Sequence, residues 1–168
     1  MARATTVDWY KKFRAGVCSV GLKASDKHAA LDEIAGNMVK GKALDPGLLE
    51  ETIRVLQARE TRATTGVGMN VAISHVTIPG LELPLCSLSV HKEGIDWSAV
   101  DGAPVHLVFV ILRPELSAPG HDPDDHINMM RWIAGLGRDG DFRAFARRAG
   151  KRSELIELLR EKLPQKGN

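Results

Sequence analysis

The chain has 168 residues, of which 43% are hydrophobic and 26% charged. These proportions are ordinary for one globular domain and exclude a disordered or collagen-like chain. With 23 basic and 21 acidic residues, the net charge is +2, which provides no basic face for nucleic acid. The longest apolar run, Val105–Leu112, is far shorter than the ~20 residues that cross a bilayer. We therefore expect a single cytoplasmic domain over 1–168 that binds no nucleic acid and does not insert into a membrane.

The first half of the chain predicts one strand and two helices. Residues 1–15 are expected to form an N-terminal arm that docks in part, because it carries three aromatic side chains. Residues 17–22 predict a strand, and Ser25 offers an N-cap for a helix over 26–40. Asp45-Pro46 is typical of a second helix start, and apolar residues then recur at helical spacing up to position 56.

The second half predicts a buried sheet followed by helices. Residues 85–91 form a strand candidate, and the continuous apolar run 105–112 is typical of a strand buried on both faces. Three further helices are expected near 124–137, 140–149 and 153–163. Together these elements predict an α/β fold with a central mixed β-sheet that helices flank on both faces.

Two cysteines occur, Cys18 and Cys86, and both lie in apolar segments. Two cysteines are too few for a disulfide scaffold. We expect two reduced, packed thiols, as is usual for a cytoplasmic protein.

Histidine is the side chain whose ordinary pKa lies nearest neutrality, so each histidine is a candidate for chemistry. The six are His28, His75, His91, His106, His121 and His126. His28 is expected to be exposed on a helix, His91 to lie at a surface strand end, and His106 to be a satisfied structural residue. His75 differs because it follows a glycine-rich loop and lies between short apolar segments, where functional side chains concentrate.

The period of the second helix breaks at Arg59, so residues 59–70 are expected to form a loop. Glycines allow backbone N–H groups to face an anion, and threonines add hydroxyl donors. We assign a phosphate-binding loop to Thr64, Thr65, Gly66, Gly68 and Asn70. A tight structural turn explains the same residues, and only the combination with His75 and Arg59 favours the functional interpretation.

Residues 59–75 run RETRATTGVGMNVAISH. An RE pair, a Thr-Thr-Gly turn and an Ala-Ile-X-His ending in this order resemble the active-site signature of the fructose/mannitol-type enzyme IIA domains. These domains belong to the bacterial phosphoenolpyruvate-dependent phosphotransferase system and include the nitrogen-regulatory type. The resemblance extends from about residue 17 to 162, with further matches at 22–27, 92–105 and 126–130.

This resemblance implies that His75 accepts a phosphoryl group from phospho-HPr, and that Arg59 and His126 line the same pocket. A neutral imidazole is a competent nucleophile, and a guanidinium is a planar donor for phosphoryl oxygens. The implied partners are an HPr-like phosphocarrier and either an enzyme IIB domain or a regulated protein; no cofactor is implied. The chain departs from the pattern at Ser74, where proline is usual, and at Met69 and Val71, where glycines are common.

Two alternatives remain beside the phosphocarrier. His121 and His126, with the aspartates between them, are residue types that hold divalent metals, but a capped helix start explains the acids as well, and we expect no metal. The chain is also compatible with a non-catalytic regulatory binding module that uses the fold without transferring phosphate.

Overall fold

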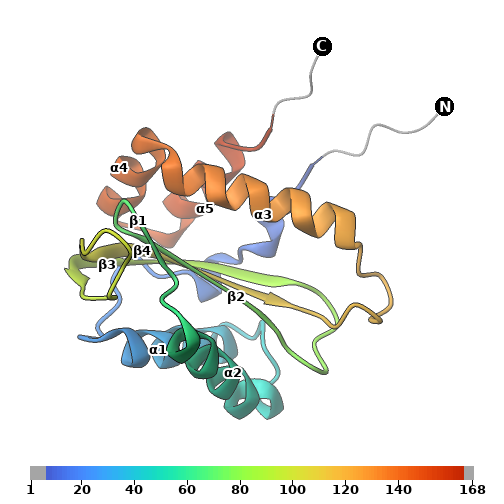
Figure 1. Ribbon diagram of the computed structural model, residues 1–168. Coiled ribbons are helices and arrows are strands. Elements are labelled where there is room, and N and C mark those ends of the chain that lie inside the picture. The colour runs from blue at the N-terminus through green and yellow to red at the C-terminus, as the bar shows by residue number, and fades with distance from the viewer. Residues whose placement is uncertain (1–6, 165–168) are drawn as a thin grey trace.

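The computed structural model describes residues 7–164 (Figure 1). A four-stranded sheet with strand order β1-β2-β4-β3 forms its centre. The strands are β1 (Gly66–Gly68), β2 (Val71–Thr77), β3 (Leu85–Ile95) and β4 (Val105–Arg113). Because β2 and β4 are parallel and the other two pairs antiparallel, the sheet is mixed.

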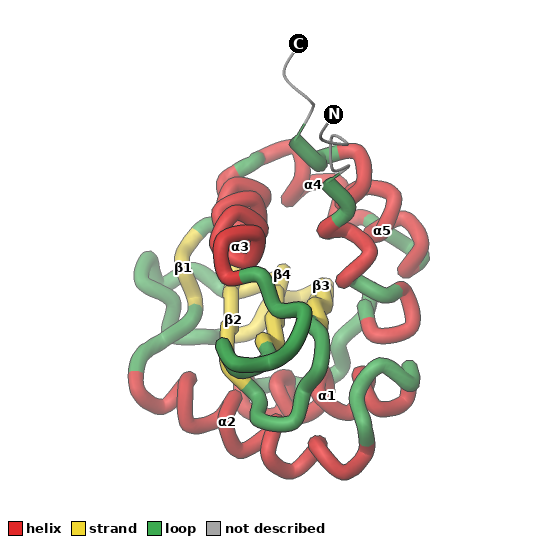
Figure 2. The backbone as a smooth tube through the Cα atoms, turned by 90° about the vertical axis from the view of Figure 1, so that its right-hand side faces the viewer, coloured by secondary structure: helices red, strands yellow, loops and turns green. Residues whose placement is uncertain are grey.

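Helices cover both faces of this sheet, which confirms the predicted fold class. α1 (Lys27–Lys40) and α2 (Leu49–Arg62) lie on one face. α3 (Pro123–Arg138), α4 (Gly140–Arg148) and α5 (Arg152–Glu161) lie on the other. Figures 1 and 2 show these two layers from orthogonal directions, with α3 running roughly along the direction of the strands. Within residues 7–164, no helix combines the length and the hydropathy that a membrane crossing needs.

Strand β4 separates two hydrophobic cores. From Leu107 to Leu112, its odd-numbered residues, such as Phe109, pack with α3–α5, and its even-numbered ones, such as Val108, pack with α1 and α2. Residues 105–112 are all buried, as the continuous apolar run predicts. The same alternation in β2 directs Ile73 toward α3 and Ala72 toward α1 and α2. Since successive residues of a strand point to opposite faces, His75 lies on the α3 face.

The predicted strand over 17–22 is wrong. The chain forms a 3₁₀ turn over Ala15–Val17 and then meets β3 through a single bridge, Ser19 to Ser89. The Ser19 hydroxyl accepts a hydrogen bond from Gly21 N at 3.2 Å. Such a local side-chain turn competes with a ladder and prevents a regular edge strand.

Three other boundaries differ from the sequence predictions. α2 continues through Arg62, so the loop begins at residue 63 rather than 59. The N-cap of α1 is Asp26, whose Oδ1 accepts from Ala29 N, rather than Ser25. β3 extends to residue 95, and His91 is therefore buried within a strand, where its Nδ1 accepts from Gly94 N, rather than exposed at a strand end. His28 is exposed and His106 is buried and hydrogen-bonded, as predicted.

The described part of the N-terminal arm docks as predicted; residues 1–6 lie outside the described residues. Trp9 and Phe13 are buried against Trp132 of α3, with ring centroids 5.6 and 6.1 Å from it. The indole Nε1 of Trp9 donates to Asp125 Oδ1 at 3.0 Å, which ties the arm to the first turn of α3.

Both cysteines are free and buried, as predicted. Burial raises the pKa of the Cys18 thiol to about 11, and burial raises the pKa of Cys86 further still. Removing water from around a thiolate disfavours the charged form, so both groups are neutral thiols.

Two glycines approach closely where the end of α1 packs on the 3₁₀ turn over Ala15–Val17. A Cβ on Gly41 would lie 2.6 Å from the carbonyl oxygen of Gly16, which is backbone and cannot move aside cheaply. Gly36, inside α1, has open space around the same position.

We expect Gly41→Ala to lower the free energy of unfolding by about 1–3 kcal/mol through this clash. Gly36→Ala is the matched control and should instead raise it by about 0.5–1 kcal/mol, since alanine favours a helix interior. Urea unfolding followed by circular dichroism measures both. Equal effects of the two substitutions would contradict the packing argument.

Candidate functional site

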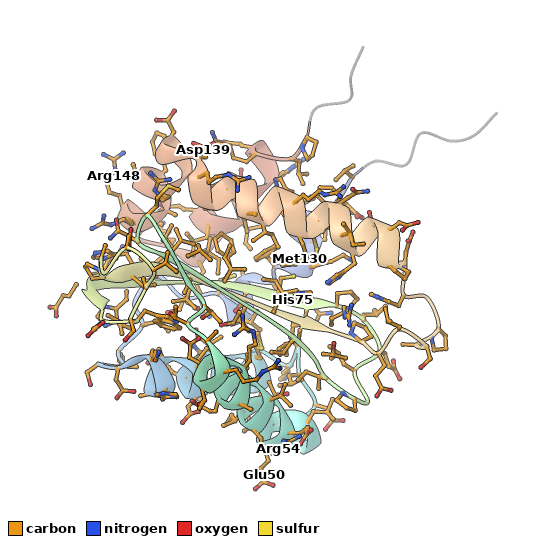
Figure 3. The ribbon with its side chains drawn as sticks, in the orientation of Figure 1. Glu50, Arg54, His75, Met130, Asp139 and Arg148 are labelled. Atoms are coloured by element: carbon orange, nitrogen blue, oxygen red, sulfur yellow. The ribbon has the colours of Figure 1, made fainter. Side chains whose placement is uncertain are left out.

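Two histidines meet between the sheet and α3. His75 comes from the second half of β2, and His126 from the first turn of α3. Their Nε2 atoms are 2.8 Å apart, and the rings are stacked with centroids 4.9 Å apart. His126 is buried, whereas His75 is half-buried and retains access to solvent. Figure 3 shows His75 between the sheet and α3, on the same side as Met130.

Local capping fixes where His126 stands. Asp122 is the N-cap of α3 and accepts hydrogen bonds from the backbone N of Asp124 and Asp125. Pro123 occupies the first helical position, where its missing N–H costs nothing. The aspartates considered as metal ligands in the sequence therefore form the N-cap and the first turn of α3. Because the cap sets the helix register, His126 faces inward one turn later.

The surroundings of the pair favour neutral imidazoles. Burial, and then the positive charge of Arg113, lower the pKa of His75 below its ordinary value. The pKa of His126 falls to about 4, chiefly through burial and then through His75, with smaller effects from His121, Arg113 and Lys12. An Nε2–Nε2 hydrogen bond also needs one protonated and one unprotonated nitrogen. Both rings are thus neutral near pH 7 and share a proton.

Arg113 is a site residue that the sequence reasoning missed. It ends β4, pairs in register with Thr77, and donates from Nε and Nη2 to the Thr77 hydroxyl at 3.2 and 3.0 Å. Strand parity places it on the His75 face only once the register is known: Arg113 lies two residues after Ile111, the parallel partner of His75.

Arg59 lies at the last turn of α2, and its Nη1 donates to the carbonyl oxygen of Ala63 at 2.8 Å. The carbonyl oxygen of Thr65, two residues after Ala63, accepts a hydrogen bond from Ile73 N. The segment that follows α2 therefore runs along the outer edge of β2. Among the hydrogen bonds of residues 7–164, none joins Arg59 to either histidine. Its place in the pocket stays a prediction.

The threonines of the expected phosphate-binding loop have partners within the fold. Thr65 is buried; its hydroxyl donates to Glu60 and accepts from Trp97 Nε1 and Ser74 Oγ. The Thr64 hydroxyl donates to Trp97 O at 3.0 Å. Ser74, which replaces the usual proline of the resembling family, is thus part of a buried network.

The two glycines belong to β1, and Asn70 to the tight turn that leads into β2. Gly66 approaches Ala99 so closely that a Cβ would lie 2.7 Å from it. Gly68, Met69 and Asn70 all have positive φ, of 97°, 55° and 66°. Met69 N donates to Asp101 Oδ2, so a carboxylate of the chain itself already occupies this concave backbone. The assignment of these residues to a phosphate-binding loop stays a prediction.

His121 completes the group of histidines, with its ring centroid 5.5 Å from that of His126. The buried His121 Nε2 and His126 Nδ1 both lack a hydrogen-bond partner among the described residues. No group of three or more His, Cys, Asp or Glu side chains within residues 7–164 is arranged to hold a metal ion.

Comparisons with known proteins agree with this architecture. The family model described as phosphoenolpyruvate-dependent sugar phosphotransferase system, EIIA 2, matches residues 12–162. A nitrogen regulatory protein of Pseudomonas aeruginosa is 31% identical over 141 residues, which cover 83% of this chain and 86% of that protein.

Two solved structures share the fold. The nitrogen regulatory protein IIA-Ntr of Neisseria meningitidis superposes with a TM-score of 0.77 at 21% identity, over 90% of this chain and 98% of that one. The mannitol enzyme IIA of Escherichia coli, in complex with phosphorylated enzyme IIB, has a TM-score of 0.65 at 18% identity, over 89% and 97%. With a family model that spans residues 12–162 and a relative that matches along most of its length, the chain belongs to the EIIA 2 family of the phosphoenolpyruvate-dependent sugar phosphotransferase system.

Proposed function

We propose that the protein is a cytoplasmic phosphocarrier that accepts a phosphoryl group from phospho-HPr on His75, for regulation or for a sugar-transport phosphorelay. The observation that carries this proposal is the pairing of His75 with His126 through their Nε2 atoms, at the residue where the family signature ends. Half-burial leaves His75 reachable by a partner protein, while its neighbour is fixed inside the domain.

The hydrogen-bonding pattern indicates which nitrogen reacts. His126 Nδ1 is buried without a partner, and a buried N–H without an acceptor is rarer than a buried acceptor without a donor. The proton of His126 therefore lies on Nε2 and is donated to His75 Nε2. This leaves a lone pair on His75 Nε2 and the remaining proton of that ring on Nδ1.

In the transfer, the lone pair of His75 Nε2 attacks phosphorus and forms the N–P bond. The bond between phosphorus and the donor breaks, and its electron pair stays with the donor. Little covalent chemistry is asked of the protein, which acts by positioning and by charge stabilisation. His126 Nε2–H then donates to a phosphoryl oxygen in place of the nitrogen it held before.

The comparisons guide the choice of partner. The Escherichia coli mannitol enzyme IIA forms a complex with a phosphorylated enzyme IIB, which supports an enzyme IIB domain as one recipient. The Pseudomonas aeruginosa relative is a nitrogen regulatory protein, which supports a regulated protein instead. We favour the regulatory role, because the match to that relative covers 83% of this chain and 86% of the relative.

We expect His75→Ala to abolish acid-labile phosphorylation by phosphoenolpyruvate, enzyme I and HPr, because it removes the nucleophile. His28→Ala and His106→Ala are the controls and should retain it. Mass mapping of the modified residue under alkaline conditions gives the site. Equal phosphorylation of His75→Ala would refute the assignment, and a wild-type protein that accepts no phosphate would favour the regulatory binding module.

We expect Arg59→Lys and His126→Ala to slow transfer without unfolding the protein. Each lost charge-assisted hydrogen bond is worth about 1.5–3 kcal/mol, or roughly 10- to 100-fold in rate if it acts fully in the transition state. Transfer kinetics and circular dichroism on the same samples separate a catalytic effect from a loss of fold. Unchanged kinetics in both variants would remove Arg59 and His126 from the site.

We expect the neutral pair to make the protein less stable in acid. The folded-state pKa of His126, about 4, lies below the unfolded value near 6.5, so the unfolded chain binds more protons between these two values. The contribution of His126 to the free energy of unfolding is complete above pH 6.5. It is lost as the pH falls, and the loss at pH 5 is on the order of 2 kcal/mol. Urea unfolding at pH 7.5 and 5 measures the loss.

The matched comparison is His126→Gln against His28→Gln, an exposed histidine of α1. The first substitution should flatten the pH dependence, while the second should leave it unchanged. Identical pH dependence in wild type and His126→Gln would contradict the lowered pKa.

A further inference from the structure

We propose that Arg113 is the cation that binds the phosphoryl group on His75, an inference that rests on the proposed function of that histidine. Arg113 is the one charged residue of an otherwise apolar strand end, Ile111-Leu112-Arg113. Arg113 is half-buried at the end of a core strand. Because charged groups are usually buried only when they are paired, its guanidinium is expected to have an anionic partner.

Strand geometry brings Arg113 to the histidine pair. β2 and β4 are parallel, with His75 opposite Ile111 and Thr77 opposite Arg113. Neighbouring strands are ~4.8 Å apart and residues two apart along a strand ~6.6 Å, so the Cα atoms of His75 and Arg113 are roughly 8 Å apart on one face. An arginine side chain spans such a distance.

The Thr77 hydroxyl orients the guanidinium. It accepts from Nε and Nη2 together, which uses two of the five N–H groups of Arg113. Within residues 7–164 the guanidinium of Arg113 makes no other hydrogen bond, and no carboxylate in this range lies within 4.0 Å of it. The remaining donors form a planar fork that suits phosphoryl oxygens.

The electrostatics agree with this geometry. The charge of Arg113 lowers the pKa of both His75 and His126. The other charged or titratable groups that act on this pair are Lys12 from the arm and His121 from the loop before α3. All of them favour an anion at the pair, and the nearby carboxylate of Asp125 is held by Trp9. A phosphoryl group adds about −1.5 to −2 charges at pH 7 and supplies that anion.

Arg59, the cation that the family resemblance implies, donates to Ala63 O. Two arginines thus approach β2 from different sides: Arg59 from the outer edge, and Arg113 from the neighbouring strand. The geometry assigns to Arg113 the contact with the phosphoryl oxygens on the α3 face, where the histidine rings meet.

The test compares Arg113→Gln, Arg113→Lys and Arg54→Gln, the last an exposed arginine of α2 that makes the same change in net charge far from the site. Inorganic phosphate is titrated into each protein while the ring nitrogen signals of His75 and His126 are followed by NMR. Arg113→Gln should bind phosphate roughly 10- to 100-fold more weakly than wild type. Arg113→Lys should fall between them, and Arg54→Gln should match wild type.

Two further readouts exclude a merely structural effect. The pKa of His75 should rise in Arg113→Gln, because a neighbouring positive charge has been removed, and should stay low in Arg113→Lys. The rate of phosphoryl transfer from phospho-HPr should fall in parallel with phosphate affinity. Circular dichroism establishes whether each variant is folded. If Arg113→Gln does not fold, the phosphate affinity of Arg113→Lys tests the assignment instead.

Failure of the proposed function and failure of this inference give different experimental results. A wild-type protein that accepts no phosphoryl group refutes the phosphocarrier, while the phosphate titration still tests Arg113. Phosphate affinity that is unchanged in Arg113→Gln, or a wild-type protein whose histidine signals do not respond to phosphate, overturns the assignment of Arg113, whatever the transfer assay shows.

Discussion

A buried carboxylate, that of Glu60, is the constraint on which the site depends. Its side chain is fully buried, and an isolated charge in that position would be very costly. It is compensated by Lys27 Nζ at 3.2 Å and by the backbone N and hydroxyl of Thr65. Since these partners come from α1 and from the segment before β1, the carboxylate can be satisfied only when helices and sheet edge are assembled together. Removing one partner of such a buried pair typically costs about 3–5 kcal/mol.

The same network decides where β2 lies. Thr65 has one hydroxyl proton and two lone pairs, and all three are used, by Glu60, Trp97 and Ser74. Ser74 faces this network and His75 faces the opposite side of the sheet, because neighbours in a strand alternate. Fixing Ser74 therefore presents His75 to α3. Glu60 of the RE pair therefore helps to position His75 through the strand that lies between them.

The elements that depend on hydrophobic period and on capping residues could be predicted from the sequence. The doubly buried run 105–112 and the two-faced helical cover follow from burial alone, and both are observed. The apolar content of segment 17–22 predicts a strand, but it does not indicate the Ser19 turn that interrupts pairing. The apolar period predicts too early an end for α2, because polar residues interrupt the period without ending the helix. Glu60 stays in the helix through partners such as Lys27, which is distant in sequence. His75 and His126 could be named from the family signature, whereas Arg113 required the parallel register of β2 and β4, which no local pattern contains.

The two thiols of the core have a chemical consequence. Oxidation and alkylation require a thiolate that a reagent can reach, and Cys18 and Cys86 offer neither, since both are buried and their pKa values are raised. Cys86 belongs to β3 and Cys18 to the segment bridged to that strand, so exposing either one means opening the sheet. The two thiols of the native domain are therefore protected from electrophiles, and they become reactive only in molecules in which β3 or the segment beside it has come apart from the core.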